Sequence, residues 1–408
     1  MTPAWLVRLM RISLLNLVVV AIYGTLMRYK IAFDFPFLEQ KHLLHAHSHF
    51  AFSGWVTHML YCGLLYWLVP YLSLQRQKAY KLLLLGNLIS AWGMLLAFTV
   101  QGYKLVSISF STLSIIIAVL FCIRFIQDTR TLFRESVTAQ WAVMGLCFHV
   151  FSSMGPFTLA WILASKQMLP KLYLASIYFY LHFQYNGWFF FGMIALLSTQ
   201  FSLESGFFKK MCWVFSLCLF PTYFLSTLWA DIPQLLYILT VSTALIQCTA
   251  WIFMLRKIIP VIHASKAPTP YKKVHLFLYA SLLAISLKFL LQTVSSIPSL
   301  SQWVFGFRPI VIAYLHLVLL AGISIFLIAI LFLKGYIHLV PSALKWAYWL
   351  LSGIVVNELL LIMQGLAGFI SFPLLYINES LLWAAIWILS GTIGLLYFSR
   401  KPESYVAS

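Results

Sequence analysis

The stretch that decides the fold is His47-Ser-His49-Phe-Ala-Phe-Ser-Gly54-Trp55, and two weaker copies of it follow. Residues 180–188 read Tyr-Leu-His182-Phe-Gln-Tyr-Asn-Gly-Trp, and residues 314–322 read Tyr-Leu-His316-Leu-Val-Leu-Leu-Ala-Gly. His49, His182 and His316 are 133 and 134 residues apart, close to one third of the 408-residue chain. A fixed period indicates an internal repeat. We therefore predict three repeat units, at about residues 1–135, 136–270 and 271–408.

The composition around these stretches is that of a membrane protein. Hydrophobic residues make up 62% of the chain and charged residues 9%, against about 45–50% and about 25% in soluble domains. These figures exclude a soluble enzyme, a disordered chain and a disulfide scaffold. The apolar runs are about 20 residues long or longer and lack alternating polarity, which favours spanning helices over barrel strands. We predict an all-α polytopic protein with twelve transmembrane helices, in three four-helix units with a pseudo-threefold arrangement. The helices are expected near residues 7–27, 44–73, 79–101, 107–127, 138–165, 172–200, 209–230, 233–259, 274–294, 308–335, 343–368 and 377–399.

The basic residues predict the orientation of the chain in the bilayer. The net charge is +18, which in a soluble protein would suggest nucleic acid, but here it lies in short clusters between apolar runs. Of the 27 Lys and Arg residues, 19 fall on the side of the N-terminus and 7 on the other, and Lys288 lies inside a span. The positive-inside rule then places both termini in the cytoplasm. We expect a lipid bilayer and no nucleic acid as partner, and we read the first apolar run as a retained helix rather than a signal peptide.

The histidines are concentrated in the second predicted helix. Residues 39–58 hold His42, His45, His47, His49 and His58, and polar groups at membrane depth are costly and tend to mark function. At 3.6 residues per turn, His47 and His49 point to opposite sides, His42, His45 and His49 share one face, and His47 and His58 share another. Neutral imidazole binds haem iron and copper. A zinc site on the first of these faces is a minor option, and hydrogen bonding to a neighbouring carbonyl is the structural alternative for each histidine.

The six cysteines point to no site of their own. They lie mostly within apolar runs and form no CxxC, no CxxCH and no pair of pairs. The sequence therefore gives no support for a disulfide framework, structural zinc or a covalent c-type haem.

In its twelve predicted spans, its three units and its segment Ala46-His47-Ser48-His49-Phe50, the chain resembles the haem–copper oxidase subunit I superfamily. In that superfamily a His-x-His pair on one membrane helix binds two different haems. The chain lacks the superfamily's His-Pro-Glu-Val-Tyr stretch and its adjacent His-His copper pair. It looks closer to divergent NnrS-type membrane haem proteins tied to nitric oxide stress, which it also resembles at Gly306-Phe307-Arg308-Pro309.

The resemblance implies a cofactor and a set of ligands. We expect one or two haems, b-type in the first place, with copper or non-haem iron left open. His49 would pair with His182 around one haem, and His47 would hold a second haem or metal facing His316. The pairing of His49 with His316 stays open. Arg308 and Lys288 are placed where either could pair with haem propionates.

Two further residues are candidate metal ligands. His45 shares a helix face with His49, and Glu358 is the single acidic residue deep in a predicted span. Glu358 resembles the glutamate that binds non-haem iron in the superfamily's nitric oxide reductases. A proton relay is a second role for it, and a structural, hydrogen-bonded or Lys-paired Glu is a third.

The expected function is that of a haem–copper oxidase-like membrane protein, with electron transfer or NO/O₂ handling rather than standard proton-pumping oxygen reduction. Whether it turns over a substrate as an oxidoreductase stays open, and its electron donor is unknown. A non-enzymatic haem or metal sensor or scavenger is the first alternative, and a transporter is the second. We expect the protein in the inner (plasma) membrane of a bacterium.

Two polar residues are expected beside the candidate ligand His182, and three other histidines are expected in solvent. Gln184 and Asn186 could hydrogen-bond His182 or a neighbouring group, and His149 lies in the middle of a predicted span. Three histidines near predicted loops are expected to be solvated, namely His263, His275 and His338.

Overall fold

The described residues of the computed structural model are almost entirely helical. They are residues 2–166, 169–230, 232–265, 269–297, 299–300 and 307–399, and within these ranges no strand forms beyond one isolated bridge between Ile337 and Ser399. The prediction of an all-α chain is confirmed. A helix satisfies its backbone hydrogen bonds within itself, which is what a segment surrounded by lipid requires.

The helices follow the apolar runs of the sequence closely. In chain order they are α1 (Ala4–Ala32), α2 (Gln40–Phe50), η1 (Ala51–Thr57), α3 (His58–Leu68), η2 (Val69–Tyr71), α4 (Leu74–Gln101), α5 (Leu105–Thr129), α6 (Val137–Ser152), α7 (Met154–Ser165), α8 (Pro170–His182), η3 (Phe183–Phe189), α9 (Phe190–Gln200), α10 (Ser205–Thr222), η4 (Tyr223–Ala230), α11 (Gln234–His263), α12 (Thr269–Val294), α14 (Arg308–His316), η5 (Leu317–Ser324), α15 (Ile325–Leu333), α16 (Pro341–Phe369) and α17 (Ile377–Tyr397). Segments η1, η3 and η5 are π-helical, and η2 and η4 are 3₁₀-helical.

Ten helices among the described residues are long and apolar enough to cross a membrane. This number is smaller than the twelve spans predicted. Residues 40–71 and 170–200 are also helical throughout, but a π-helical segment divides each of them. The chain is therefore a multi-pass helical membrane protein, with ten clear candidate spans.

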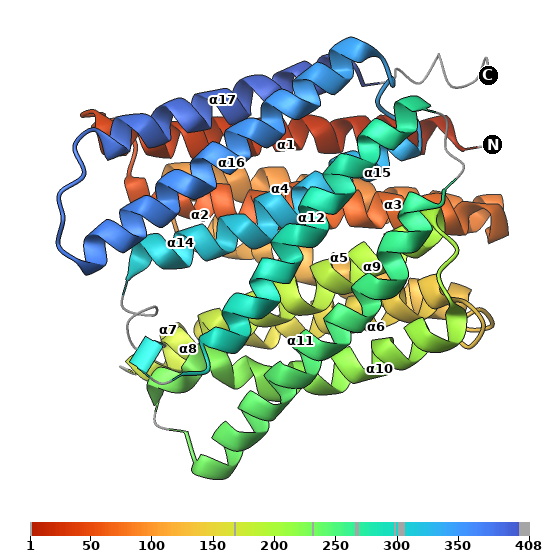
Figure 1. Ribbon diagram of the computed structural model, residues 1–408, viewed down its shortest axis with the longest axis horizontal. Coiled ribbons are helices and arrows are strands. Elements are labelled where there is room, and N and C mark those ends of the chain that lie inside the picture. Colours follow the sequence, from red (N-terminus) through yellow and green to blue (C-terminus); the bar gives the residue numbers. More distant parts are fainter. Residues whose placement is uncertain are drawn as a thin grey trace. The chain divides into compact units, whose positions relative to one another are not determined.

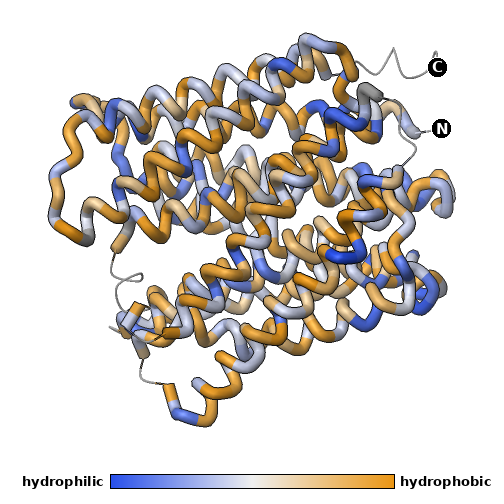
Figure 2. The backbone as a smooth tube through the Cα atoms, in the orientation of Figure 1, coloured by the Kyte–Doolittle hydropathy of each residue, from blue (hydrophilic) through white to orange (hydrophobic). Residues whose placement is uncertain are grey.

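The exposed side chains of the helices fit a lipid environment. On α4, Leu82, Ile89 and Leu96 recur at seven-residue spacing and are each at least 60% exposed. The opposite face of the same helix buries polar Asn87 with its apolar neighbours. Figure 2 shows hydrophobic residues along the length of the helices, with many hydrophilic residues near their ends. An apolar exterior of this kind is favourable in a bilayer and costly in water.

The contacts divide the chain into two compact units. Unit 1 comprises residues 1–121, 267–278 and 324–408, and unit 2 comprises residues 122–266 and 279–323. The boundaries cut through α5, α12 and η5, so neither unit is a continuous stretch. The three-unit organisation was inferred from the spacing of His49, His182 and His316 in the sequence, and it stays a prediction.

In unit 1 the two ends of the sequence lie together. Helix α17 packs against both α1 and α16, and Figure 1 shows the red first helix beside the blue last helices. Arg11 on α1 donates a hydrogen bond of 3.1 Å to the hydroxyl of Ser399. Close approach of α16 and α17 requires Gly391, because a Cβ atom there would lie 2.8–3.1 Å from Leu350 atoms.

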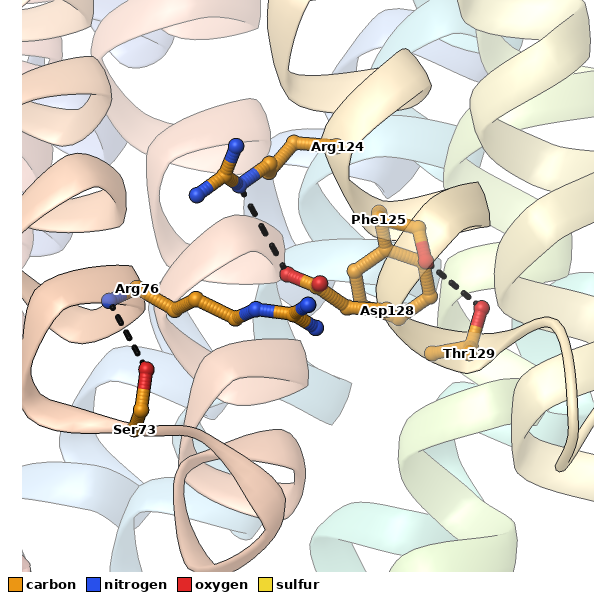
Figure 3. Close-up of polar contacts among 6 residues, drawn as sticks. All are labelled: Ser73, Arg76, Arg124, Phe125, Asp128 and Thr129. Atoms are coloured by element: carbon orange, nitrogen blue, oxygen red, sulfur yellow. Dashed lines mark hydrogen bonds and ion pairs between the residues drawn. The ribbon is translucent and has the colours of Figure 1, made fainter.

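Serine side chains cap the starts of α4 and α6. Ser73 precedes α4 and accepts a hydrogen bond from the backbone N–H of Arg76 (Figure 3). Near the end of α5, Arg124 and Asp128 form an i,i+4 ion pair of 3.8 Å. Pro lies in the first turn of α8, α14 and α16, where its missing N–H costs no helical hydrogen bond.

Candidate functional site

A π-helical segment follows each of the three repeated histidines. Segment η1 begins two residues after His49, η3 begins one residue after His182, and η5 begins one residue after His316. π-Helical residues are rare, and they occur frequently at functional sites. Three of them at one register of a repeat mark these positions as the candidate site. The periodicity of the sequence gives no signal for them.

The first π segment is held by side chains from neighbouring helices of unit 1. Asn16 on α1 donates a hydrogen bond of 2.6 Å to the carbonyl oxygen of Gly54. Asn87 on α4 donates one of 3.1 Å to the carbonyl oxygen of Ser53. Both asparagines are buried. These contacts join two carbonyl groups of the π segment to α1 and α4.

His47 and His49 point to different neighbours, as their spacing predicts. The His47 Nδ1 atom lies 3.0 Å from the carbonyl oxygen of Val20 on α1. A Cβ atom at Gly24, one turn further along α1, would lie 3.3 Å from the His47 ring. His49 instead stacks on Phe98, with ring centroids 4.5 Å apart. One helix therefore presents two histidines to two separate environments.

The face with His42, His45 and His49 is confirmed as one face. His42 packs against Gly102, where a Cβ atom would lie 2.4 Å from its Nε2 atom. The His45 ring lies 4.6 Å from the Tyr103 ring, and the His49 Nε2 atom is 2.8 Å from the Tyr103 hydroxyl. All three histidines thus face the end of α4 and the turn after it.

The expectation that His58 shares a face with His47 is wrong. His58 is fully buried, and its Nδ1 atom accepts a hydrogen bond of 3.1 Å from Asn87 on α4, whereas His47 contacts α1. Segment η1 lies between the two histidines, and its wider turns change the angular register. A count at 3.6 residues per turn therefore fails across it.

In unit 2, His182 uses both ring nitrogens. Its Nε2 atom lies 2.9 Å from the carbonyl oxygen of Leu219, and its Nδ1 atom accepts from the Asn186 amide at 3.0 Å. It is 2% exposed. For His182 to bind iron, one of these hydrogen bonds has to break.

His149 is the second histidine of this region. Gln184 on η3 donates hydrogen bonds to the His149 Nδ1 atom at 2.9 Å and to the Ser152 hydroxyl at 2.8 Å. The His149 ring also stacks on Trp188, with centroids 5.3 Å apart. The predicted hydrogen bonding of Asn186 to His182, and of Gln184 to a neighbouring group, is confirmed.

In the third repeat, His316 contacts the backbone of its own helix. The His316 Nδ1 atom lies 2.8 Å from the carbonyl oxygen of Ile312, one turn earlier in α14. Ser281 on α12 donates a hydrogen bond of 2.6 Å to the carbonyl oxygen of Gly322 in η5. Arg308 begins α14, but its side chain lies outside the described part of the chain, as does all of Gly306.

Glu358 has a local partner and a basic neighbour in unit 1. It is 8% exposed, and the adjacent Asn357 amide donates to it at 3.3 Å. Arg28 on α1 is close enough to act on it electrostatically. Arg28 lies one turn beyond Gly24, the residue that packs against His47.

Not every predicted position agrees with the structure. His263 is exposed, as expected for a residue at the end of α11. His275 is only 5% exposed, because it lies within α12 rather than in a loop. The expectation that it is solvated is wrong.

The histidines of the repeats are not gathered into a cluster of metal ligands within the described part of the chain. Among the residues described, no group of three or more His, Cys, Asp or Glu side chains is arranged to hold a metal ion. The minor option of zinc on the face with His42, His45 and His49 is therefore not supported. A haem needs one or two histidines per iron. His47 and His316 each direct Nδ1 to a carbonyl oxygen, as metal-binding histidines commonly do.

The predicted pairs of histidines join different units. His47 and His49 belong to unit 1, whereas His182 and His316 belong to unit 2. The pairings His49–His182 and His47–His316, and the alternative His49–His316, all stay predictions. Three residues that hydrogen-bond the π segments were not predicted from the sequence, namely Asn16, Asn87 and Ser281. Each is a polar residue within an apolar run, and that pattern could have indicated them.

Compared with known protein families and with curated proteins, the chain matches no family model and no curated protein.

Proposed function

We propose that the chain is an integral-membrane haem-binding protein of the haem–copper oxidase type, which transfers electrons or handles a small gas such as NO or O₂. The observation that carries the proposal is the π-helical segment that follows each repeated histidine. π-Helical turns are rare, and one that recurs at the same place in each repeat therefore indicates a functional role. The proposal includes twelve spans, because residues 40–71 and 170–200 are helical over a length that can cross a bilayer.

His47 is one candidate ligand. Its Nδ1 atom lies 3.0 Å from the Val20 carbonyl oxygen, an arrangement that metal-binding histidines commonly adopt. Gly24 lets α1 pack closely on the ring, since a Cβ atom there would lie 3.3 Å from it. His316 has the same Nδ1 arrangement through Ile312. Bound haem would supply a one-electron redox centre and an iron atom that can take up a diatomic gas.

His49 and His182 are the other candidates. The Nε2 atom of His49 lies 2.8 Å from the Tyr103 hydroxyl, and both nitrogens of His182 have hydrogen-bond partners, so either histidine would have to exchange a partner to bind iron. The proposal includes one or two haems. A bacterial inner membrane with both termini in the cytoplasm, an unidentified electron donor, and copper or non-haem iron near His45 or Glu358 remain parts of the proposal that rest on the sequence.

The test is a reduced-minus-oxidised optical spectrum, with haem and metal analysis, on detergent-purified protein. We expect sharp bands at b-haem positions and one to two haems per chain. His47→Ala should remove a haem band, whereas His263→Ala, at an exposed position, should not. A folded preparation that is colourless and free of metal would contradict the proposal and favour a transporter. Equal loss of haem in both variants would contradict the assignment of His47.

A further inference from the structure

Lys288 is a buried basic residue without a counter-charge. It lies on α12 in unit 2 and is 3% exposed. Its Nζ atom is 3.7 Å from the centroid of the Phe289 ring. No ion pair or hydrogen bond joins its ammonium to any residue that the structure describes. A buried charge is costly unless an opposite charge compensates it, and such residues in membrane proteins mark functional sites.

The described acidic residues of unit 2 lie at the far end of its helices. Asp128 is in the last turn of α5, Glu135 precedes α6 and Glu204 precedes α10. Lys288 lies six residues before the other end of α12, roughly 9 Å from it at the α-helical rise. At that end Tyr237, in the first turn of α11, donates a hydrogen bond of 3.1 Å to the Ser296 carbonyl. The remaining acidic residue, Asp231, is outside the described residues.

The surroundings of Lys288 are mainly aromatic, with a few polar groups. Cys248 and His182 lie close enough to interact with it electrostatically, and Gln292 donates a hydrogen bond of 3.2 Å to Gln247. The Phe289 ring packs against Phe190, Phe215 and Trp251 at centroid distances of 5.5–5.7 Å. Gln292, one turn after Lys288, is 7% exposed, and its Oε1 atom has no hydrogen-bond donor among the described residues. Such surroundings suit a ligand that is mainly apolar and carries one small polar group.

We propose that Lys288 binds the carboxylate of an amphiphile inside unit 2. A single ammonium matches a single negative charge, whereas a phosphate carries more charge and is matched better by the planar fork of arginine. Two amphiphiles with this group can reach a membrane interior, namely a haem through its propionate and a free fatty acid. The haem case rests on the proposed function, and the fatty-acid case does not.

The first arm of the experiment uses haem and its dimethyl ester, in which both propionates are blocked. Haem-depleted protein is reconstituted with each, and the dissociation constants are compared. A charge-assisted hydrogen bond should make the wild type bind haem roughly tenfold to a hundredfold more tightly than the ester. Lys288→Met should abolish this difference. Lys288→Arg should keep most of it, and Lys210→Met, at an exposed position in the same unit, should keep all of it.

The second arm uses oleate and methyl oleate with haem-depleted protein. If a fatty acid is the ligand, saturating oleate should raise the Tm of the wild type by at least about 2 °C, and methyl oleate should not. Lys288→Met should remove this rise, and Lys210→Met should retain it. This arm stays decisive if the purified protein contains no haem.

The outcomes distinguish a haem propionate from a free fatty acid as the ligand, and both from the absence of carboxylate binding. Discrimination in the first arm alone identifies the propionate, and discrimination in the second alone identifies a free fatty acid. If the wild type distinguishes acid from ester in neither arm, the inference is overturned. That comparison needs no variant, so it holds even if Lys288→Met does not fold. A colourless protein that still distinguishes oleate from its ester would end the haem proposal and leave the Lys288 site standing.

Discussion

The side-chain amide of Asn16 donates a hydrogen bond of 2.6 Å to the carbonyl oxygen of Gly54, 38 residues further along the chain. The Asn16 Oδ1 atom in turn accepts from the Trp92 indole at 3.2 Å. Ser281 makes the corresponding contact with Gly322 in the third repeat, also at 2.6 Å. Helices that precede two of the repeated histidines thus stabilise the π-helical segments that follow them.

Asn16→Ala should destabilise the protein and disturb the candidate site together. The Gly54 carbonyl would lose its donor in a buried position, which costs about 1–3 kcal/mol. We expect a lower denaturation midpoint in detergent and, in haem-loaded protein, a shifted spectrum. Thr112→Ala, which removes a hydroxyl that bonds only within its own helix, is the matched control. An unchanged midpoint for Asn16→Ala would contradict the role given to this hydrogen bond.

The long helices could be predicted from the sequence, and the π-helical segments could not. Hydrophobic runs locate helices because the bilayer imposes their length and polarity. The turn after His49 depends instead on partners from other helices, Asn16 and Asn87, and these contacts exist only in the folded chain. The same limit explains the wrong placement of His58, which followed from counting ideal turns across Ala51–Thr57.

The sequence identified the candidate ligand residues, but it did not predict all of their contacts. The spacing placed His47 and His49 on opposite sides of their helix, and the contacts with Val20 and Phe98 confirm this. The contact of the His182 Nε2 atom with the Leu219 carbonyl comes from another helix, so no local sequence pattern predicts it. The pairing of ligands across repeats stays a prediction for the same reason.

His182→Ala should lower stability even in haem-free protein. The Leu219 carbonyl and the Asn186 amide would both lose a buried partner, at a cost of about 1–3 kcal/mol for each unsatisfied group. Thermal unfolding of haem-depleted protein measures this directly. His263→Ala is the control and should leave the Tm unchanged. Equal Tm values for the two variants would show that the His182 hydrogen bonds contribute nothing to stability.

Gly391→Ala should weaken the packing of α16 against α17. The added Cβ atom would meet the Leu350 backbone as well as its side chain, so neither helix can yield locally. Overpacking of this kind costs about 1–3 kcal/mol, and small residues are the usual means of close helix contact in membranes. Gly206→Ala is the control, since its Cβ atom would meet nothing within 4 Å. If the two variants unfold at the same denaturant concentration, the close contact at Gly391 does not contribute to the stability of the protein.

Arg28 and Glu358 should behave as a weakly coupled pair in a double-mutant cycle. Glu358 is 8% exposed, and Arg28 is the basic group that acts on it. No ion pair within 4.0 Å joins Arg28 to Glu358, and Arg28 is only half-buried, so their coupling should be about 1 kcal/mol or less. Arg28→Met should therefore destabilise the protein only slightly, and by less still when Glu358 is already Gln. A metal-binding or proton-carrying Glu358 predicts otherwise, because Glu358→Gln would then remove metal or activity whatever residue occupies position 28. Unfolding midpoints and metal content, measured on all four proteins of the cycle, distinguish the structural role of Glu358 from the functional one.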